Sequence, residues 1–253
     1  NVFVYACGTG FHSQLMPDQT LDIGFSATAM HYISEKPCQI PNHVHMVGAS
    51  GDALDAFSLQ ARDDWNRILL SRSAELKPGG RLVFMNFGID EDGCYLGNTG
   101  GINMFNTFSE IWCGLHEEGL ITGDELADAT FSQFYRTRKE FCAPLVEPSS
   151  GVYKTGLRLV SAHTGVVKCP YRAAYEAAGE AMSAQEFAVS YIPTLRSWSE
   201  TVFATALDTA RPEDERATLV DLFYQRYEDR VAADPIGHAM DYVHCYLAIE
   251  KIP

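Results

Sequence analysis

Two glycines near the start of the chain are the first residues whose type and spacing could do chemistry. Gly8 and Gly10 follow residues 2–5, an apolar run with the composition of a short strand. A glycine loop after a strand lets the backbone approach a ligand, and such loops open many dinucleotide and S-adenosylmethionine (SAM) sites. However, Tyr5 stands at the end of the run, where such sites usually have an acidic residue. The next acid after a strand-like run, Asp22, lies closer to Gly10 than the usual separation of about 20 residues between the glycine loop and the ribose-binding acid. The spacing therefore favours an ordinary glycine-rich turn.

Two histidines in sequence, His43 and His45, raise the question of a metal site. On a strand they would lie on the same side, which suits metal binding, but no Asp, Glu or Cys close by completes a third ligand. The seven cysteines are scattered without any CxxC pair, which is typical of free thiols in a reducing cytoplasm. No GxSxG motif indicates a hydrolase. We expect a cytoplasmic protein with no bound metal.

The charge of the chain excludes several classes of partner. It has 33 Asp and Glu against 19 Lys and Arg, so its formal net charge is −14. This acidic field would repel a nucleic acid. No run approaches the roughly 20 apolar residues that a membrane span needs. We expect neither a nucleic-acid nor a membrane partner. Arg136, Arg138 and Lys139 either steer an anion or form a solvated helix start.

Strands and helices alternate in the first half of the chain, which predicts an α/β fold. Residues 21–25 form a strand-like run, and Asp63 can cap a helix whose apolar side chains recur at helical spacing. Residues 77–80, Lys-Pro-Gly-Gly, end that helix, and residues 81–87 are the most apolar strand candidate. A helix, a stop and a buried strand make one unit of a parallel sheet.

Helices dominate two later blocks of the chain. Residues 104–115 carry apolar side chains at helical spacing, and by default Phe108 and Trp112 belong to a core. The pattern also predicts a strand over 156–167, a helix over 173–187, an apolar helical stripe over 219–231 and a final strand over 242–249. The helices therefore concentrate near 100–145 and 173–233.

Several segments match one set of motifs in the same order. Residues 10–17, GFHSQLMP, resemble GSFYGRLFP, and residues 25–37, FSATAMHYISEKP, resemble HSSYSLHWLSQVP. Residues 57–80 resemble a helix ending in GG, 81–88 an MVLTFLG strand, and 104–121 a helix ending in EEGLI. Residues 131–140 resemble an FNxPxYxPSxxE turn, 196–200 an RAxxEP helix, and 242–252 a terminal strand. These motifs belong to the SABATH family of plant and microbial SAM-dependent carboxyl methyltransferases, which the chain resembles.

The resemblance implies a Rossmann-like SAM-methyltransferase sheet with an α-helical cap. The methyltransferase core would comprise residues 1–89, 146–169 and 233–253, and the cap over the acceptor pocket would comprise 90–145 and 170–232. The glycine-rich SAM loop of the family and its acidic residues would lie upstream of Asn1. We therefore expect the core to be incomplete at its N-terminus.

The resemblance also assigns site residues. His31 and Tyr32 match acceptor-contacting positions, with Tyr32 keeping a hydrogen-bond donor where the family has Trp, and Thr28 replaces an aromatic residue, which would widen the pocket. The match adds Met104, Phe105, and Phe134 or Tyr135 to the acceptor pocket. Gly10 and Phe11, followed by Phe25 and Ser26, match cofactor-binding positions. Some members hold Mg²⁺ at the FN turn, but Ser132 replaces the Asn, so we expect no metal.

The implied reaction transfers a methyl group from SAM to the carboxylate of a small, aromatic acid, giving a methyl ester and S-adenosylhomocysteine (SAH). A carboxylic acid with a pKa near ~4 is already ionised at neutral pH, so the reaction needs positioning and no catalytic base. His31 could donate to the carboxylate, with charge assistance if it is protonated.

Other functions stay open at this point. They are N-methylation of a purine-like acceptor, a non-catalytic small-molecule-binding member of the same fold, and a dehydrogenase that uses Gly8 and Gly10 as its nucleotide loop. We expect a small-molecule carboxylic acid as the partner, and a homodimer is possible.

Overall fold

A mixed sheet forms one half of the molecule. The computed structural model describes residues 2–252. In the sheet, β1 (Leu21–Ala27), β2 (Leu76–Ile89), β5 (Tyr242–Lys251) and β4 (Leu157–Val167) are neighbours in that order, and the short β3 (Arg136–Thr137) pairs with the end of β2. β1 and β2 are parallel, whereas β5 runs antiparallel to both β2 and β4. The α/β class is confirmed, and the parallel pairing expected from the first half holds for β1 and β2.

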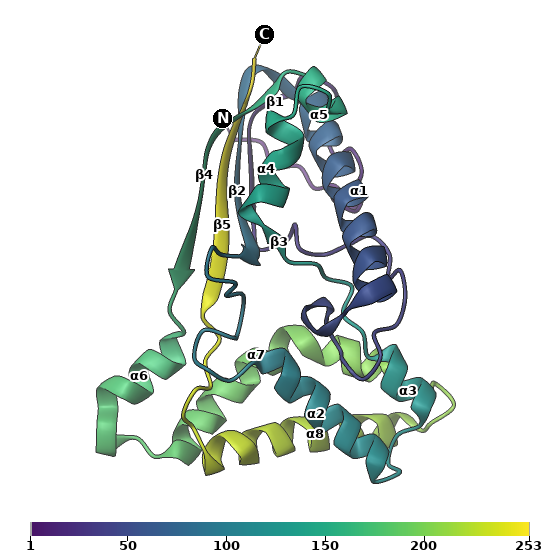
Figure 1. The fold of residues 1–253 in the computed structure, drawn as a ribbon, viewed down its shortest axis with the longest axis vertical. Helices are drawn as coiled ribbons and strands as arrows, with labels where there is room; N and C mark the ends of the chain where they lie inside the picture. Colours follow the sequence, from purple (N-terminus) through teal and green to yellow (C-terminus); the bar gives the residue numbers. More distant parts are fainter. Residues whose placement is uncertain (1, 253) are drawn as a thin grey trace.

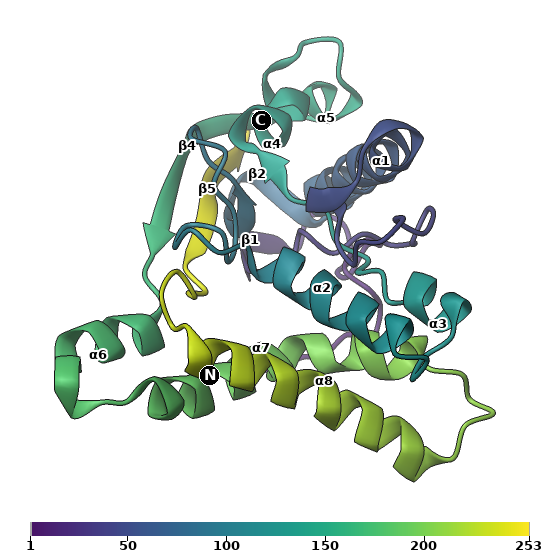
Figure 2. The same cartoon turned by 60° about the horizontal axis from the view of Figure 1, so that its bottom comes forward.

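The helices lie in two groups. α1 (Gly51–Glu75), α4 (Arg138–Val146) and α5 (Gly151–Lys154) lie beside the sheet (Figure 1). A separate layer crosses one end of the sheet, and Figure 2 turns it toward the reader. This helical layer comprises α2 (Met104–Glu117), α3 (Gly123–Asp128), α6 (Pro170–Ala178), α7 (Ala184–Ala206) and α8 (Glu213–Ala233). Single 3-10 turns occupy Met46–Gly48 and Gly179–Ala181.

The division into a core and a cap stays a prediction. α4 lies within the predicted cap range 90–145, yet it packs beside β4 and α5. Asn1 and Pro253, the outermost positions of the predicted core, lie outside the described residues.

Local backbone chemistry explains where the predicted elements were wrong. Residues 2–5 form no strand and are exposed. α1 begins at Gly51, well before Asp63, and continues to Glu75. Residues 77–80 lie inside β2, where Gly79 takes a positive φ of 83° and the β1–β2 register shifts. The Pro-Gly-Gly signal thus marks an irregular strand start rather than a loop, because glycine tolerates this left-handed conformation.

The predicted helix over 173–187 is broken in two. Gly179 has a φ of 54°, which ends α6, and Ser183 then starts α7 with a capping box to Glu186. The strands over 156–167 and 242–249 and the helices around 104–115 and 219–231 are confirmed, with bounds shifted by a few residues.

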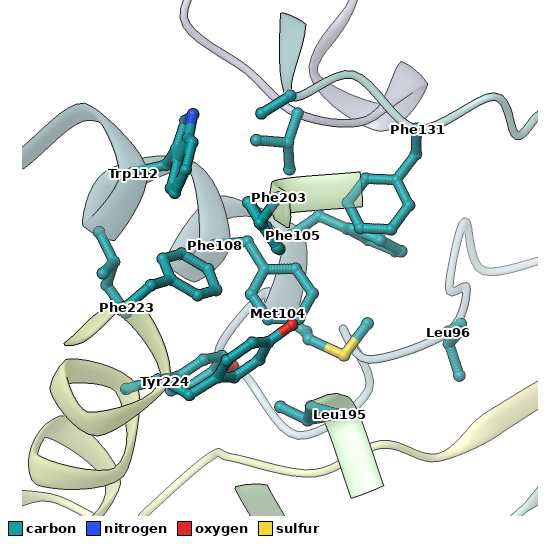
Figure 3. Close-up of a cluster of buried hydrophobic side chains, with 14 of the residues drawn as sticks. Leu96, Met104, Phe105, Phe108, Trp112, Phe131, Leu195, Phe203, Phe223 and Tyr224 are labelled. Atoms are coloured by element: carbon teal, nitrogen blue, oxygen red, sulfur yellow. The ribbon is translucent and has the colours of Figure 1, made fainter. Parts of the chain in front are cut away.

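Each half of the molecule has its own apolar core. One lies between the sheet and α1, where Trp65 packs against Phe84 and Phe141. The other fills the helical layer, and Figure 3 shows Phe108 and Trp112 from α2 in a cluster with Phe223 from α8. Phe108 and Trp112 are fully buried, which confirms that they are core residues.

Asp241 joins the three segments that connect the sheet to the helical layer. Its buried carboxylate accepts hydrogen bonds from the Thr99 hydroxyl, the Lys168 ammonium and the Cys169 N–H, each at 2.8 Å. Thr99 follows β2, Lys168 and Cys169 follow β4, and Asp241 itself precedes β5. These bonds hold the pKa of Asp241 below its usual value against the opposing effect of burial. One side chain therefore sets how the connecting segments meet.

We predict that Asp241→Ala lowers the free energy of unfolding by about 3 kcal/mol, because it leaves the buried Cys169 N–H and the half-buried Thr99 hydroxyl without their acceptor. Urea denaturation followed by circular dichroism measures this loss. Asp221→Ala, which removes an exposed carboxylate, is the control and should cost much less. The difference in free energy of unfolding between the wild-type protein and Asp241→Ala should shrink as the pH falls below the ordinary Asp pKa and Asp241 becomes protonated. Equal stability of the two variants would contradict the prediction.

Candidate functional site

A cavity of about 170 Å³ lies where the sheet meets the helical layer. Its walls come from the segment after β1, the end of β2, the segment before β3, helix α7 and the start of β5. The lining residues are Thr28, His31, Tyr32, Phe87, Leu96, Gln133, Tyr135, Trp198, Met240 and Tyr242. Four of these, Thr28, His31, Tyr32 and Tyr135, were predicted from the sequence as acceptor-pocket residues.

Backbone pairing brings the two main walls together. Thr28 takes a positive φ of 50° and donates its N–H to Met85 O at 2.7 Å, which turns the chain away from β1. The chain then pairs with residues 131–135: Phe134 N–H donates to His31 O at 2.8 Å, and Tyr32 and Gln133 form an antiparallel bridge. Residues distant in sequence thus face the same space.

His31 is a neutral wall of the cavity. It is buried, with its ring 4.3 Å from that of Tyr32 and 4.9 Å from that of Phe87. Burial, with a smaller contribution from the charge of Arg136, lowers the pKa of His31 to about 3. His31 is therefore uncharged at neutral pH, and the charge-assisted hydrogen bond that the sequence allowed does not form there.

The other titratable groups around the cavity are neutral as well. Burial raises the pKa of Tyr32 and raises that of Tyr135 well above the usual value, so both keep their hydroxyl protons. Burial also lowers the pKa of His45 and His244. The cavity therefore offers uncharged hydrogen-bonding groups and aromatic rings.

Three predicted acceptor residues do not line this cavity. Met104 and Phe105 are fully buried behind it, with the Phe105 ring 6.0 Å from Tyr135 and 6.3 Å from Trp198. Phe134 and Tyr135 are neighbours on an extended segment, so their side chains point to opposite sides. Tyr135 enters the cavity, whereas Phe134 lines a separate cavity of about 540 Å³ between α1 and α4.

Sequence reasoning missed six lining residues, Phe87, Leu96, Gln133, Trp198, Met240 and Tyr242. Trp198 and Tyr242 lie in segments that the family motifs singled out, and Phe87 lies in the predicted strand 81–87. Gln133 occupies a variable position of its motif, and Leu96 and Met240 lie in irregular connections. No local pattern identifies these last three.

The predicted cofactor residues lie on a loop and on the edge strand. The loop holding Gly10 and Phe11 is fixed by Arg72, which donates to Phe11 O at 2.9 Å and to Ser13 O at 2.7 Å. Glu75 holds Arg72 at 2.6 Å and accepts from Met16 N–H at 3.2 Å.

The same loop meets the acceptor segment. His12 Nε2 lies 3.2 Å from Tyr32 O. On β1, the Phe25 side chain is 65% exposed and Ser26 is half-buried. The structure thus brings the loop next to one wall of the cavity and leaves an aromatic side chain of β1 uncovered.

Helix α1 also fixes the acceptor segment. Its buried Asp64 accepts from the N–H and the hydroxyl of Ser34, both at 2.7 Å. Arg136, 2% exposed, donates to Met30 O at 2.8 Å and also to Ala61 O on α1. The interpretation of Arg136 as part of a solvated helix start is therefore wrong, because its guanidinium is buried and bonded to backbone oxygens.

The histidine pair does not form a metal site. His43 and His45 lie on a turn before Met46–Gly48 rather than on a strand. His43 Nε2 lies 3.1 Å from Asn106 Oδ1, while His45 stacks on Phe105 with ring centroids 3.9 Å apart. Among residues 2–252, no three His, Cys, Asp or Glu side chains gather closely enough to hold an ion. Nor is any helix in that range long and apolar enough to cross a membrane.

We predict that His31 stays uncharged from pH 8 down to about pH 4, because its pKa lies near 3. NMR of the imidazole resonances, assigned by comparison with His31→Gln, measures this. Because the unfolded imidazole takes up a proton near pH ~6.5, the wild-type protein should also lose stability relative to His31→Gln as the pH falls below that value. A His31 midpoint between pH 6 and 7 would refute the neutral wall.

Comparisons with known proteins agree on one family. The family model described as "SAM dependent carboxyl methyltransferase" matches residues 1–251. Jasmonate O-methyltransferase of Arabidopsis thaliana is 26% identical over 57% of this chain and 40% of its own length. Indole-3-acetate O-methyltransferase 1 of the same plant is 28% identical over 49% of this chain and 34% of its own length.

A solved structure of a loganic acid methyltransferase with SAH superposes with a TM-score of 0.67 at 14% identity, covering 97% of this chain and 65% of that one. This likeness confirms the Rossmann-like methyltransferase fold with its helices. The chain spans well under half the length of the two plant relatives. The match of the family model along nearly the whole chain shows that this protein belongs to the SAM-dependent carboxyl methyltransferase family, which the motifs had indicated.

Proposed function

We propose that this protein transfers a methyl group from SAM to the carboxylate of a small, single-ring acid. The observation that carries the proposal is the chemistry of the 170 Å³ cavity: of the residues that line it, none is Asp, Glu, Lys or Arg. Its walls are aromatic rings, neutral hydroxyls and an amide. Such a cavity can hold and orient an anion that meets a positive charge on its other side. Its one imidazole, that of His31, has a pKa of about 3 and is therefore a very weak base. The plant relatives named for jasmonate and indole-3-acetate support a carboxylic acid as the acceptor.

In the proposed reaction the protein mainly positions the two substrates and excludes water. SAM, when bound, supplies an electrophilic methyl group on a sulfonium. The acceptor carboxylate, ionised above a pKa of about 4, supplies the electron pair without any proton transfer. A carbon–oxygen bond forms as the carbon–sulfur bond breaks, and the two charges cancel. Tyr32 would hold the carboxylate by donating a hydrogen bond, and Phe87 and Trp198 would exclude water.

The proposed SAM residues fit a flat, polar-edged nucleoside. The Phe25 ring is 65% exposed and can lie against an adenine, and Ser26 offers a hydroxyl beside it. Gly10 has open space where a side chain would begin, so a ligand could approach its backbone closely. The bond between His12 and Tyr32 O places this loop beside the acceptor cavity. The free cysteines support a cytoplasmic location.

The cavity size limits the acceptor. A cavity of roughly 150 Å³ is known to hold benzene, so 170 Å³ suits one ring with a small substituent. On the far side of Tyr32, Gln133 and Trp198 lies a second cavity of about 430 Å³, which shares these three residues as its wall. Trp198 therefore separates a small acceptor space from a larger one.

We predict that Tyr32→Phe lowers kcat for methyl transfer by about tenfold to a hundredfold, because a hydrogen bond to a charged group is lost. The affinity for SAH should change less than threefold. Radiolabelled methyl transfer and calorimetric SAH titration measure the two quantities. Tyr5→Phe, which alters an exposed tyrosine, is the matched control. Equal loss of turnover and SAH affinity would show that Tyr32 is only structural.

We predict that Trp198→Ala joins the two cavities and extends methylation to acids larger than one ring. Rates with two-ring acids such as naphthoate should rise relative to benzoate. Val189→Ala, an exposed site on the same helix, serves as the control. An unchanged ratio of the two rates in Trp198→Ala would rule out the role of Trp198 as the partition.

A further inference from the structure

The α1–α4 cavity, the space of about 540 Å³ that Phe134 lines, has no role in the methyl transfer proposed above. Residues of α1, α4 and α5 line it, and Figure 1 shows these three helices beside the sheet. Its apolar wall consists of Trp65, Leu70, Phe134, Ala143, Pro144 and Val152. A cavity of roughly 150 Å³ holds benzene, so the α1–α4 cavity can hold a much larger apolar group.

Arg136 gives this apolar cavity a positive charge. The residue is 2% exposed and lines the cavity, and burial lowers its pKa to about 10, so it stays charged at neutral pH. Its guanidinium carries five N–H groups. One donates to Met30 O at 2.8 Å and another to Ala61 O, whereas the Nε–H has no acceptor in the part of the chain that the structure describes. A charged donor that is buried without a partner costs free energy, so an acceptor from outside the chain would stabilise it.

The carboxylates whose charges act on Arg136 are bonded elsewhere. Asp64 holds the acceptor segment, and Glu140 accepts hydrogen bonds in the capping box of α4. The guanidinium instead packs over aromatic rings, with its Cζ 5.9 Å from the ring centroid of Trp65 and 5.9 Å from that of Phe134. The faces of aromatic rings attract a cation, but they do not neutralise it. The cavity wall therefore keeps a positive charge among apolar side chains.

The other charged residues of this cavity lie in water. Arg62, Glu140 and Glu147 line it too, and all three are exposed, which leaves Arg136 as the buried charge of the wall. Water and salt screen exposed charges much more than buried ones. The sign of a bound group is therefore selected by Arg136 rather than by the mouth of the cavity.

We propose that the α1–α4 cavity is a second ligand site, which binds a free organic acid with one carboxylate and a long apolar body. The carboxylate only accepts hydrogen bonds, so it pairs with the remaining N–H groups of Arg136 and neutralises the guanidinium. The apolar body lies against Trp65, Phe134 and the apolar side of α4. A neutral alcohol of the same length fills the same space but leaves the charge in place. The site does not depend on the proposed methyl transfer.

Calorimetric titration with octanoate and octan-1-ol, which share one apolar chain length, tests the site. We expect the wild-type protein to bind octanoate about tenfold or more tightly, because a hydrogen bond to a charged group contributes more than a neutral one. Arg136→Met should remove this preference. Ala143→Phe, which adds a ring to the cavity wall, should weaken both ligands about tenfold or more. Ala177→Phe, which adds the same ring at an exposed position of α6, is the matched control and should leave both affinities unchanged.

Several outcomes would overturn this site. Absence of octanoate binding, or equal affinities for octanoate and octan-1-ol in the wild-type protein, would show that Arg136 selects no anion. An octanoate affinity that Ala143→Phe leaves unchanged would place the ligand outside the cavity. The comparison of wild-type protein with Ala143→Phe decides the question if Arg136→Met does not fold. The titrations contain no methyl donor, so a protein that binds octanoate but methylates no acid would keep this site and lose the proposed function.

Discussion

Desolvation is the constraint on which the cavity depends. Burial removes the charge from His31, His45 and His244 and keeps the protons on Tyr32 and Tyr135. An anion entering such a space gives up water and gains neutral donors only. It is stabilised well only when a cation lies beside it. In the proposed reaction a sulfonium donor would meet that need, and its charge would cancel with that of the carboxylate, leaving a neutral ester in a neutral cavity.

The net charge of −14 adds to the cost of bringing an anion into this cavity. A strongly acidic protein slows the approach of anions from solution. Arg136 and Arg72, the buried cations near the site, are both bonded to backbone oxygens. They stiffen the walls and the loop and leave the acceptor space without a fixed positive charge. Under the proposed function, affinity for an acid would then depend on the donor molecule being bound first.

The sequence predicted the class of fold and several residues that line the 170 Å³ cavity, and each of these has a local cause. Thr28, His31 and Tyr32 come from one segment, residues 25–37, that resembles a family motif. The apolar spacing of residues 104–115 was enough to predict α2. The sequence did not reveal which residues line the cavity where their position depends on distant contacts. Met104 and Phe105 carry the composition of a pocket, but packing against α7 and α8 turns them into the core. Gln133 faces the cavity because its backbone pairs with Tyr32, far away in sequence, which no pattern along the chain reveals.

Helix α1 connects the two ends of the site by an unbroken rod. Asp64 anchors the acceptor segment and Arg72, two helical turns later, anchors the loop. Eight residues of α-helix rise about 12 Å, so this length is built into the backbone itself. A single inserted residue between the two anchors would swing one of them about 100° around the axis. Single substitutions can change the lining residues independently, but a change in the number of residues between these anchors would shift the proposed donor loop relative to the acceptor segment.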